Sequence, residues 1–448
     1  MILSKAFDRY APLTDLAALK EYSARPLRKS VRVNTLKTTV EAFRAYAAEK
    51  RWSLTPVPWC PDGFFLERDS TGEALGKDLR HLIGHFYMQE AASMLPAALL
   101  DPQPGDAVLD MSAAPGSKTT QMAAMMQAGH PELVEGATRG AMVPFDRAQD
   151  RLAHHDTAQA GVIVANDVQE KRLWTLKASL HRSGVTNVLV TKKVGQWFAR
   201  HMTERFDRVL CDAPCTAQGT ARKDSDALRY CSAENIGTMA RLQVALLVSA
   251  IHAAKAGGRI VYSTCTLTPE ENEGVVLEVL KMLEGKVEVV DPRKLRVTSS
   301  QTREIFENAI RDSSKVQHWL KALETRNWKL ETQPLLRLWP QTFDTEGFFC
   351  AVLEKKASTK TVEPVQWMHL QERPVSRKQT EDVQRQMTDR YGTSFLRGGE
   401  RLLLHGSESL VVTTQETADF GLAVQDYAVG LPFGKLLKDG RVLLDHEQ

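Results

Sequence analysis

Short apolar runs alternate with longer amphipathic stretches through the middle of the chain. The runs are too short for helices and predict buried strands, whereas the stretches between them repeat apolar residues at helical spacing. The strands are expected at residues 107–111, 161–167, 187–191, 206–211 and 259–264, and the helices at 170–182, 232–255 and 269–283. Strands that alternate with helices predict βαβ units and a parallel sheet with right-handed crossovers.

Two neighbouring predicted strands end abruptly in polar residues. The first runs into Asp212-Ala-Pro-Cys215, where Pro214 disfavours helical geometry in the residue before it, and the second ends in Ser-Thr-Cys265-Thr. Neighbouring parallel strands lie about 4.8 Å apart, and ligands of open α/β sheets bind at the carboxyl ends of the strands. We therefore expect Asp212, Cys215 and Cys265 to face one pocket. A strand-to-loop turn with structural cysteines is the alternative.

An earlier strand end has the features of a cofactor site. Asp110 precedes a loop of small residues, 112–118, that opens a helix, and the free amides of a helix N-terminus bind anions such as a cofactor carboxylate. The loop matches neither GxGxxG nor GxxxxGK[ST], which disfavours a dinucleotide or a nucleoside triphosphate. Asp167 ends the next strand, where an acid typically binds ribose hydroxyls. With Asp212, these carboxylates predict a Rossmann-like pocket for an adenosyl cofactor.

Two thiols in such a pocket indicate covalent catalysis. A thiolate can add to carbon 6 of a pyrimidine and so make carbon 5 nucleophilic. The base must first be flipped out of its stack. The residues alone do not show which of the two cysteines attacks.

The length of 448 residues predicts more than one domain. Residues 1–95 are expected to form a small α+β module, with a helix at 40–50 and another starting at Tyr87. Its basic stretch from Arg25 to Lys37 suits phosphate binding, unless it is only a solvated face. Residues 96–357 form the predicted catalytic domain. Residues 365–448 are expected to be β-rich and PUA-like, either an RNA-binding accessory or a folding appendage.

A repeated tripeptide marks a predicted insertion. Gln127-Ala-Gly recurs as Gln159-Ala-Gly, and removal of residues 128–159 would leave a normal helix-to-strand link. We expect a mobile surface loop here. Its three histidines, at 130, 154 and 155, favour a disordered polar loop over a metal site.

Composition narrows the class further. The net charge of +3, with 43% hydrophobic and 25% charged residues, is typical of a soluble protein and does not by itself indicate a polyanionic partner. The six cysteines are dispersed without a CxxC pair, which argues against a metal site. We find no signal peptide and no apolar window of about 18 residues for a membrane span. A monomeric, cytoplasmic protein with free thiols is expected.

Taken together, the motifs resemble the RNA 5-methylcytosine methyltransferases of the Sun (NSUN-like) family, bacterial ribosomal-RNA type. The resemblance covers roughly residues 25–355, apart from the insertion. Its motifs are Arg32-Val-Asn-Thr-Leu, Gln89-Glu-Ala-Ala-Ser-Met, residues 110–121, Asp212-Ala-Pro-Cys, Arg222-Lys-Asp, Ser263-Thr-Cys-Thr and Glu270-Glu-Asn-Glu. The Asp-Ala-Pro-Cys and Ser-Thr-Cys-Thr pair is the most specific element.

The resemblance implies an α/β fold, with a Rossmann-like S-adenosylmethionine-dependent methyltransferase domain between the two smaller domains. It implies that Cys265 attacks carbon 6, that Cys215 assists release of the methylated RNA, and that Asp212 hydrogen-bonds the cytosine. Lys118 could lower the pKa of the attacking thiol. The implied S-adenosyl-L-methionine contacts are Asp110, Ala113, Ala114, Pro115, Gly116, Ser117, Lys118, Asp167 and Asp212. The expected RNA contacts are Arg32, Asn34, Arg222 and Lys223.

The chain departs from the family pattern at two places. Thr216-Ala217 stands where the family usually has Ser-Gly, and Val194 stands where it has a cofactor-binding aspartate. We expect an active enzyme that methylates ribosomal RNA. The alternatives are a catalytically impaired RNA-binding or ribosome-assembly protein that keeps the fold, and a transfer-RNA methyltransferase.

Overall fold

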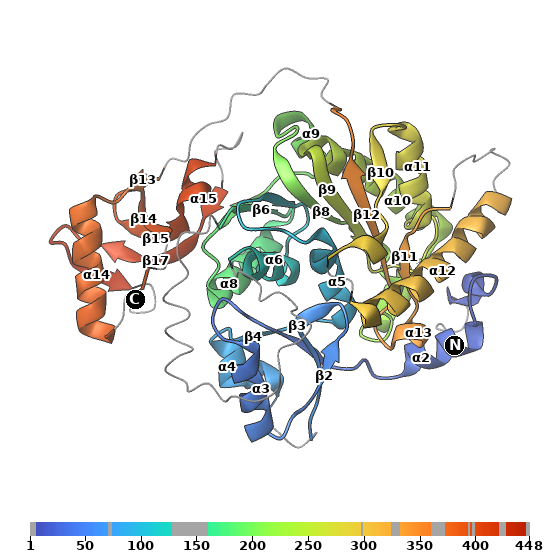
Figure 1. The fold of residues 1–448 in the computed structure, drawn as a ribbon, viewed down its shortest axis with the longest axis horizontal. Helices are drawn as coiled ribbons and strands as arrows, with labels where there is room; N and C mark the ends of the chain where they lie inside the picture. The colour runs from blue at the N-terminus through green and yellow to red at the C-terminus, as the bar shows by residue number, and fades with distance from the viewer. Residues whose placement is uncertain are drawn as a thin grey trace.

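The computed structural model contains three sheets: a large central one flanked by helices, a small N-terminal one and a C-terminal one to its side (Figure 1). It describes residues 6–69, 74–127, 160–296, 299–323, 332–359, 372–392, 395–396, 399–420 and 427–444. The predicted insertion at 128–159, with its histidines, lies outside these residues.

The central sheet has the strand order β10-β12-β9-β8-β5-β6-β7-β16, with β11 paired to β12. Strands β9, β8, β5, β6 and β7 are parallel, whereas β10, β11, β12 and β16 are antiparallel to the strands they pair with. The bounds are β5 Ala107–Asp110, β6 Val162–Asn166, β7 Val188–Thr191, β8 Phe206–Asp212, β9 Ala254–Thr264, β10 Val287–Val289, β11 Leu336–Leu338, β12 Phe348–Lys355 and β16 Tyr427–Val429. The predicted parallel sheet is confirmed.

Alternate residues along these strands face opposite helical layers. Val108 and Leu210 pack with α5, α6 and α8, whereas Leu109 and Val209 pack with α9, α10 and α11. The helix bounds are α5 Ala91–Leu100, α6 Ser117–Gln127, α8 Glu170–Ser183, α9 Trp197–His201, α10 Ala233–Ala253 and α11 Glu273–Met282. Both faces of the parallel strands are therefore buried, which explains their continuous apolar runs.

Helix α10 corrects one expectation from the sequence. Among the described residues it is long and apolar enough to cross a membrane, with a window of mean hydropathy 1.4. In this fold it is the crossover between β8 and β9, and Leu247 and Ile251 are fully buried against the sheet. Its apolar character follows from that packing.

The N-terminal sheet has the strand order β2-β3-β1-β4. Its elements are β1 Ser30–Val33, α3 Val40–Glu49, β2 Ser53–Val57, β3 Cys60–Glu67, α4 Leu79–Leu82 and β4 Phe86–Met88, preceded by α2 Leu16–Ala24. The helix expected to start at Tyr87 was placed too early, because Tyr87 pairs with Arg32 in the sheet. Helix α5 begins only at Ala91, where the Glu90 carboxylate caps it by accepting the Ser93 amide at 3.0 Å.

The C-terminal sheet has the order β13-β14-β15-β17-β18, and helix α14 lies beside it (Figure 1). Its elements are β13 Arg373–Pro374, α14 Arg377–Tyr391, β14 Glu400–His405, β15 Ser409–Thr414, α15 Gln415–Asp419, β17 Leu431–Leu436 and β18 Val442–Leu444. Strand β16 leaves this sheet and pairs with β7, so that Tyr427 lies opposite Thr191. The C-terminal region thus extends the central sheet, a connection that the sequence did not indicate.

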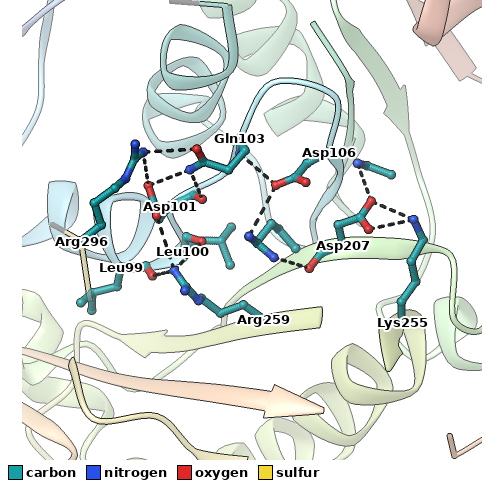
Figure 2. Close-up of polar contacts among 11 residues, drawn as sticks. Leu99, Leu100, Asp101, Gln103, Asp106, Asp207, Lys255, Arg259 and Arg296 are labelled. Carbon is teal, nitrogen blue, oxygen red and sulfur yellow. Dashed lines mark hydrogen bonds and ion pairs between the residues drawn. The ribbon is translucent and has the colours of Figure 1, made fainter. Parts of the chain in front are cut away.

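Ion pairs connect the amino ends of the parallel strands (Figure 2). Asp207, at the start of β8, accepts hydrogen bonds from Lys255 of β9 at 2.8 and 2.9 Å and from the Ala107 amide of β5 at 3.0 Å. Asp101, after α5, pairs with Arg296 at 2.9 Å. Partly exposed pairs contribute only about 0–1 kcal/mol each. Their effect is to align the starts of three strands.

A fully buried ion pair anchors the segment that follows Cys265. Arg337 of β11 donates from Nε to Glu273 Oε1 at 2.8 Å, and both side chains have no exposed surface. Arg337 also donates to the Leu267 carbonyl at 2.8 Å, and Ser313 of α12 (Ser300–Leu323) donates to Glu273 at 2.8 Å. The pair therefore joins β11, α11, α12 and the loop after β9.

Arg337→Ala should lower the free energy of unfolding by about 3–5 kcal/mol, because it leaves a buried carboxylate without its cation. Urea denaturation measures this loss. The matched control is Arg377→Ala, since Arg377 pairs with Glu381 while its own side chain is 93% exposed. That variant should lose only about 0–1 kcal/mol. Equal losses in the two variants would contradict the role given to Arg337.

Candidate active site

The two predicted thiols meet at the carboxyl edge of the sheet. Strands β8 and β9 are parallel with Asp212 opposite Ser263, so the residues that follow them leave the sheet side by side. Cys215 and Cys265 come to an Sγ–Sγ distance of 3.4 Å. The six cysteines are all free. Asp212, Cys215 and Cys265 therefore lie together at one edge of the sheet, and that they line one pocket stays a prediction.

Asp212 is held by two donors. Lys118 Nζ lies 2.8 Å from its Oδ2, and Ser263 Oγ donates to its Oδ1 at 2.6 Å. Burial lowers the pKa of Lys118, but the charge of Asp212 outweighs this and raises the pKa above its usual value. Lys118 is therefore a fixed cation, and its ammonium also lies 5.8 Å from the centre of the Phe348 ring.

Glu271 organises the loops that carry the thiols. This fully buried carboxylate accepts hydrogen bonds from the Thr216 amide at 3.0 Å, from Thr268 Oγ1 at 2.7 Å and from Gln243 Nε2 at 2.8 Å. The neighbouring Asn272 accepts a hydrogen bond from the Thr264 hydroxyl and donates one to the Thr266 carbonyl. The sequence signal was the Glu-Glu-Asn-Glu motif, but nothing in it showed that these residues position the thiol loops.

Ala217 has a backbone conformation that suits glycine. Its φ is +58°, in the left-handed region, which costs a residue with a side chain roughly 1–2 kcal/mol. This explains why a glycine is usual at this position in the family. Thr216 supplies a hydroxyl where the family usually has serine. This hydroxyl donates a hydrogen bond to Glu271 and accepts one from Gln218.

The environment of Cys215 favours its protonated form. The hydrogen bond with Cys265 and burial both raise the pKa of the Cys215 thiol well above its usual value. A thiol that keeps its proton can donate it toward a neighbouring sulfur. The Cys215 thiol can therefore donate a hydrogen bond to the Cys265 sulfur.

The loop after β5 fits the methionine end of the expected cofactor. Asp110 Oδ2 accepts Thr119 Oγ1 at 2.7 Å, whereas its buried Oδ1 has no hydrogen-bond partner. Burial raises the pKa of Asp110 to about 7, with a further contribution from Asp212. The backbone from Ala113 leads to helix α6, whose first amides have no intrahelical acceptors. A cofactor with an ammonium and a carboxylate group satisfies both features.

Asp167, the residue expected to bind the ribose, follows β6. Its Oδ1 accepts the Gln169 amide at 3.0 Å, while its buried Oδ2 accepts no hydrogen bond and lies 3.3 Å from Arg172. Arg172 also donates to the Ala114 carbonyl and so links the two halves of the cofactor site. Val194, which follows β7, has 56% of its surface exposed. An apolar side chain there can contact a purine ring but cannot accept a hydrogen bond from it.

The other expected cofactor contacts lie in the same loop. Ala113, Ala114 and Gly116 are buried, and Pro115 is exposed. Gly116 has a φ of +104°, and a Cβ there would come within 3.1 Å of Ser179. The loop is therefore packed closely on α8.

Two of the expected RNA contacts are interior residues. Arg32 donates to Gln89 and Thr120, both at 2.8 Å, and is 2% exposed. Asn34 donates to the carbonyls of Gly84 and Ser183 and is 3% exposed. These side chains tie the N-terminal sheet to α6 and α8, so the expected contact with RNA is wrong for them in this conformation.

The guanidinium group of Arg222 likewise binds other groups of the protein. It pairs with Asp344 at 2.9 Å and donates to the carbonyls of Pro26 and Thr345, leaving its side chain 1% exposed. Its role is to hold the chain before β1 against the catalytic domain, which corrects the expected RNA contact. Lys223 is exposed, so its contact with RNA stays a prediction.

The fold and its cofactor loop define the class: a Rossmann-like methyltransferase of the S-adenosylmethionine-dependent type, with two thiols at its active edge. Within this class, the chain belongs to the 16S rRNA methyltransferase RsmB/F family, whose model matches residues 97–134 and 151–354. Residues 9–91 match the N-terminal domain of 16S rRNA methyltransferase RsmF. The resemblance to RNA methyltransferases of the bacterial ribosomal-RNA type is confirmed.

Relatives support this assignment. Ribosomal RNA small subunit methyltransferase F of Vibrio cholerae serotype O1 (strain M66-2) is 40% identical over 352 residues, covering 78% of this chain and 62% of the relative. The protein of that name from Cronobacter sakazakii (strain ATCC BAA-894) is 40% identical over 344 residues, covering 76% of this chain and 59% of that relative. The chain thus spans less than two thirds of the length of these relatives.

Solved structures agree on the fold. A methyltransferase homolog protein from Pyrococcus horikoshii has a TM-score of 0.55 at 30% identity, over 78% of this chain and 93% of that one. NSun6 from Pyrococcus horikoshii, solved with SFG, has a TM-score of 0.55 at 20% identity, over 78% of this chain and 97% of that one. The second likeness bears on the fold alone.

Asp110→Asn should make stability less dependent on pH. The folded pKa of about 7 lies above the unfolded value, so the folded protein holds a proton that the unfolded chain loses, and stability falls as pH rises from about 4 to 7. The variant lacks this contribution, on the order of 2–4 kcal/mol. Urea denaturation of both proteins without cofactor at pH 5 and pH 7.5 measures the difference. The same pH dependence in both proteins would refute the raised pKa of the buried Asp110 carboxyl.

Proposed function

We propose that this protein transfers a methyl group from S-adenosylmethionine to carbon 5 of a cytosine in 16S ribosomal RNA through a covalent bond to Cys265. The observation that carries the proposal is the Sγ–Sγ distance of 3.4 Å between Cys215 and Cys265 beside the Asp212–Lys118 pair. Membership in the 16S rRNA methyltransferase RsmB/F family supports the choice of RNA.

Cys265 is the proposed nucleophile. As a thiolate it adds to carbon 6, and the electron pair of the 5,6 double bond becomes available at carbon 5. Asp212, fixed by Lys118 and Ser263, contacts the cytosine ring and stabilises the adduct. S-adenosylmethionine, when bound, supplies the methyl group that carbon 5 receives.

Cys215 is the proposed residue for product release. Its raised pKa leaves it protonated and makes its conjugate base strong. After methylation Cys215, once it has lost its own proton to solvent, accepts the proton from carbon 5. The electron pair of that C–H bond re-forms the 5,6 double bond, and the bond between carbon 6 and the Cys265 sulfur breaks to return the Cys265 thiolate. Cys215 lies close enough to Cys265 to assist this elimination.

The cofactor is proposed to lie across the strand ends of β5, β6 and β8. Asp110 and the loop from Ala113 through Ser117 bind its methionine part, and Asp167 binds its ribose. Oδ1 of Asp110 and Oδ2 of Asp167 accept no hydrogen bond within the described residues, and this supports the placement because each would gain a donor. Val194 contacts the adenine by its apolar surface.

RNA is proposed to cross the boundary between the N-terminal sheet and α8. A cavity of about 410 Å³ lies there, with Tyr87, Met88 and Arg182 among its lining residues. Trp174, on the same face of α8, is 72% exposed, and Lys177 lies 5.9 Å from its ring centre. Exposed aromatic rings interleaved with cations suit stacking of unpaired bases. The C-terminal sheet is proposed as an RNA-binding accessory.

We further propose that the protein acts as a monomer, without a metal ion, in the cytoplasm. Within the described part of the chain no group of three His, Cys, Asp or Glu side chains is arranged to hold a metal. Free thiols at the active edge suit a reducing compartment.

Isothermal titration with S-adenosylmethionine tests the cofactor site. Binding is expected in the micromolar range, about −8 kcal/mol. Asp167→Ala should weaken it about 10- to 100-fold through loss of a charge-assisted hydrogen bond to the ribose. Cys265→Ala serves as the control and should bind normally. If the unsubstituted protein does not bind, the RNA-binding alternative without catalysis gains support.

Substitution of the thiols tests the chemistry on 16S ribosomal RNA. Cys265→Ala should abolish methylation, while Cys215→Ala should accumulate a covalent RNA–protein adduct that survives a denaturing gel. Cys231→Ala, which removes another free thiol outside the site, is the control. Bisulfite sequencing locates the methylated cytosine. Normal turnover by Cys265→Ala, or no adduct with Cys215→Ala, would contradict the assigned roles.

A further inference from the structure

Glu346 is a buried carboxylate, and one of its two oxygens accepts no hydrogen bond within the described residues. It lies just before β12 and is 6% exposed. Its Oε1 is fully buried, and no hydrogen-bond donor in the described residues reaches it. An unsatisfied buried acceptor costs about 1–3 kcal/mol, so such a group calls for an explanation.

The backbone places Glu346 beside the proposed nucleophile. The Gly219 amide donates to the Cys265 carbonyl at 3.0 Å, and the Gly347 amide donates to the Gly219 carbonyl at 3.0 Å. A Cβ at Gly219 would come within 2.6 Å of the Cys265 oxygen, so these segments are in tight contact. On the other side, the Glu346 amide donates to Glu90 at 3.3 Å. The segment is therefore held against the thiol loop.

One of the charges that act on Glu346 belongs to the active site. Burial raises the pKa of its carboxyl, and the positive charges of Lys223, Lys118 and Arg222 oppose that rise. Lys118 is the residue that holds Asp212. Glu346 therefore shares the electrostatic environment in which the target base would react.

Two neighbouring carboxylates, Asp212 and Glu90, already accept hydrogen bonds on both oxygens. Both oxygens of Asp212 are occupied, one by Lys118 and one by Ser263. Both oxygens of Glu90 accept backbone amides, from Ser93 and Glu346. Unlike them, Glu346 has a buried oxygen that accepts no hydrogen bond within the described residues and can accept one from an incoming donor.

Cytosine presents such a donor. Its exocyclic amine at carbon 4 carries two N–H groups, whereas uracil has a carbonyl acceptor at the same place. An ionised carboxylate can only accept hydrogen bonds. It would bind the amine of cytosine and repel the oxygen of uracil, and sites built on such a bond discriminate strongly.

We propose that Glu346 is a specificity-determining residue that accepts a hydrogen bond from the exocyclic amine of the target cytosine. The inference rests on the proposed function, since it names how that site selects its base. Glu90 positions Glu346 through the backbone and does not contact the base.

The test compares two RNA fragments that contain the cytosine located by bisulfite sequencing. In one fragment 5-azacytosine replaces that base and keeps the amine. In the other, 2-pyrimidinone replaces it and lacks the amine. Both bases can accept the Cys265 thiolate at carbon 6. The rate of covalent adduct formation with each RNA, with S-adenosylmethionine present, is measured on denaturing gels for the unsubstituted protein, Glu346→Ala, Glu346→Gln and Glu90→Gln.

Glu346→Ala should slow adduct formation with the 5-azacytosine RNA about 10- to 100-fold, the size expected for a hydrogen bond to a charged group. Its rate with the 2-pyrimidinone RNA should match the unsubstituted protein. Glu346→Gln retains a carbonyl acceptor, so its rate of adduct formation with the 5-azacytosine RNA should fall less. Glu90→Gln, the control, should affect both RNAs equally.

Equal losses by Glu346→Ala on both RNAs would assign it a structural role and overturn the inference, and so would no loss on either. An unsubstituted protein that forms no adduct with either RNA would instead overturn the proposed function, and the inference with it. The two failures are therefore distinguishable.

Discussion

The parallel pairing of β8 with β9 is the constraint on which the active edge depends. Its register sets Asp212 opposite Ser263 and brings the following cysteines to 3.4 Å. A shift of one residue would turn these side chains to the other face of the sheet. Glu271 and Asn272 then hold the loops beyond the strands, so the thiols are placed by the ladder and by a buried hydrogen-bond network together.

Burial gives the charged groups of this edge their chemical character. Asp212 and Lys118 compensate each other, which keeps a charged pair stable where water is largely excluded. Among the described residues no cation forms an ion pair with Asp110 or Glu346, and burial raises the pKa of both carboxyls. Such uncompensated groups cost stability. They mark the places where cofactor and base would supply what the protein lacks.

The N-terminal basic motif shows why residue type alone misled the prediction of RNA contacts. Arg32 and Asn34 were expected at a surface because arginines beside a strand suit phosphate. In the structure their donors satisfy groups on α6, α8 and the N-terminal sheet. The guanidinium fork that binds phosphate serves equally well to join two domains. Which of these uses applies depends on what lies opposite, and the sequence does not contain that information.

The sequence by itself determined the parallel sheet and the positions of Asp110, Asp167, Asp212 and both thiols at its carboxyl edge. The alternation of apolar runs with helical stretches and the sharp polar strand ends are local signals. Because βαβ units place successive strands side by side, these signals also predict which strand ends lie next to each other. Only the tertiary structure decided that β16 joins the sheet, that the side chain of Arg222 is buried, and that the segment of Glu346 lies beside that of Cys265. These outcomes depend on contacts between segments far apart in the chain, for which no local pattern exists.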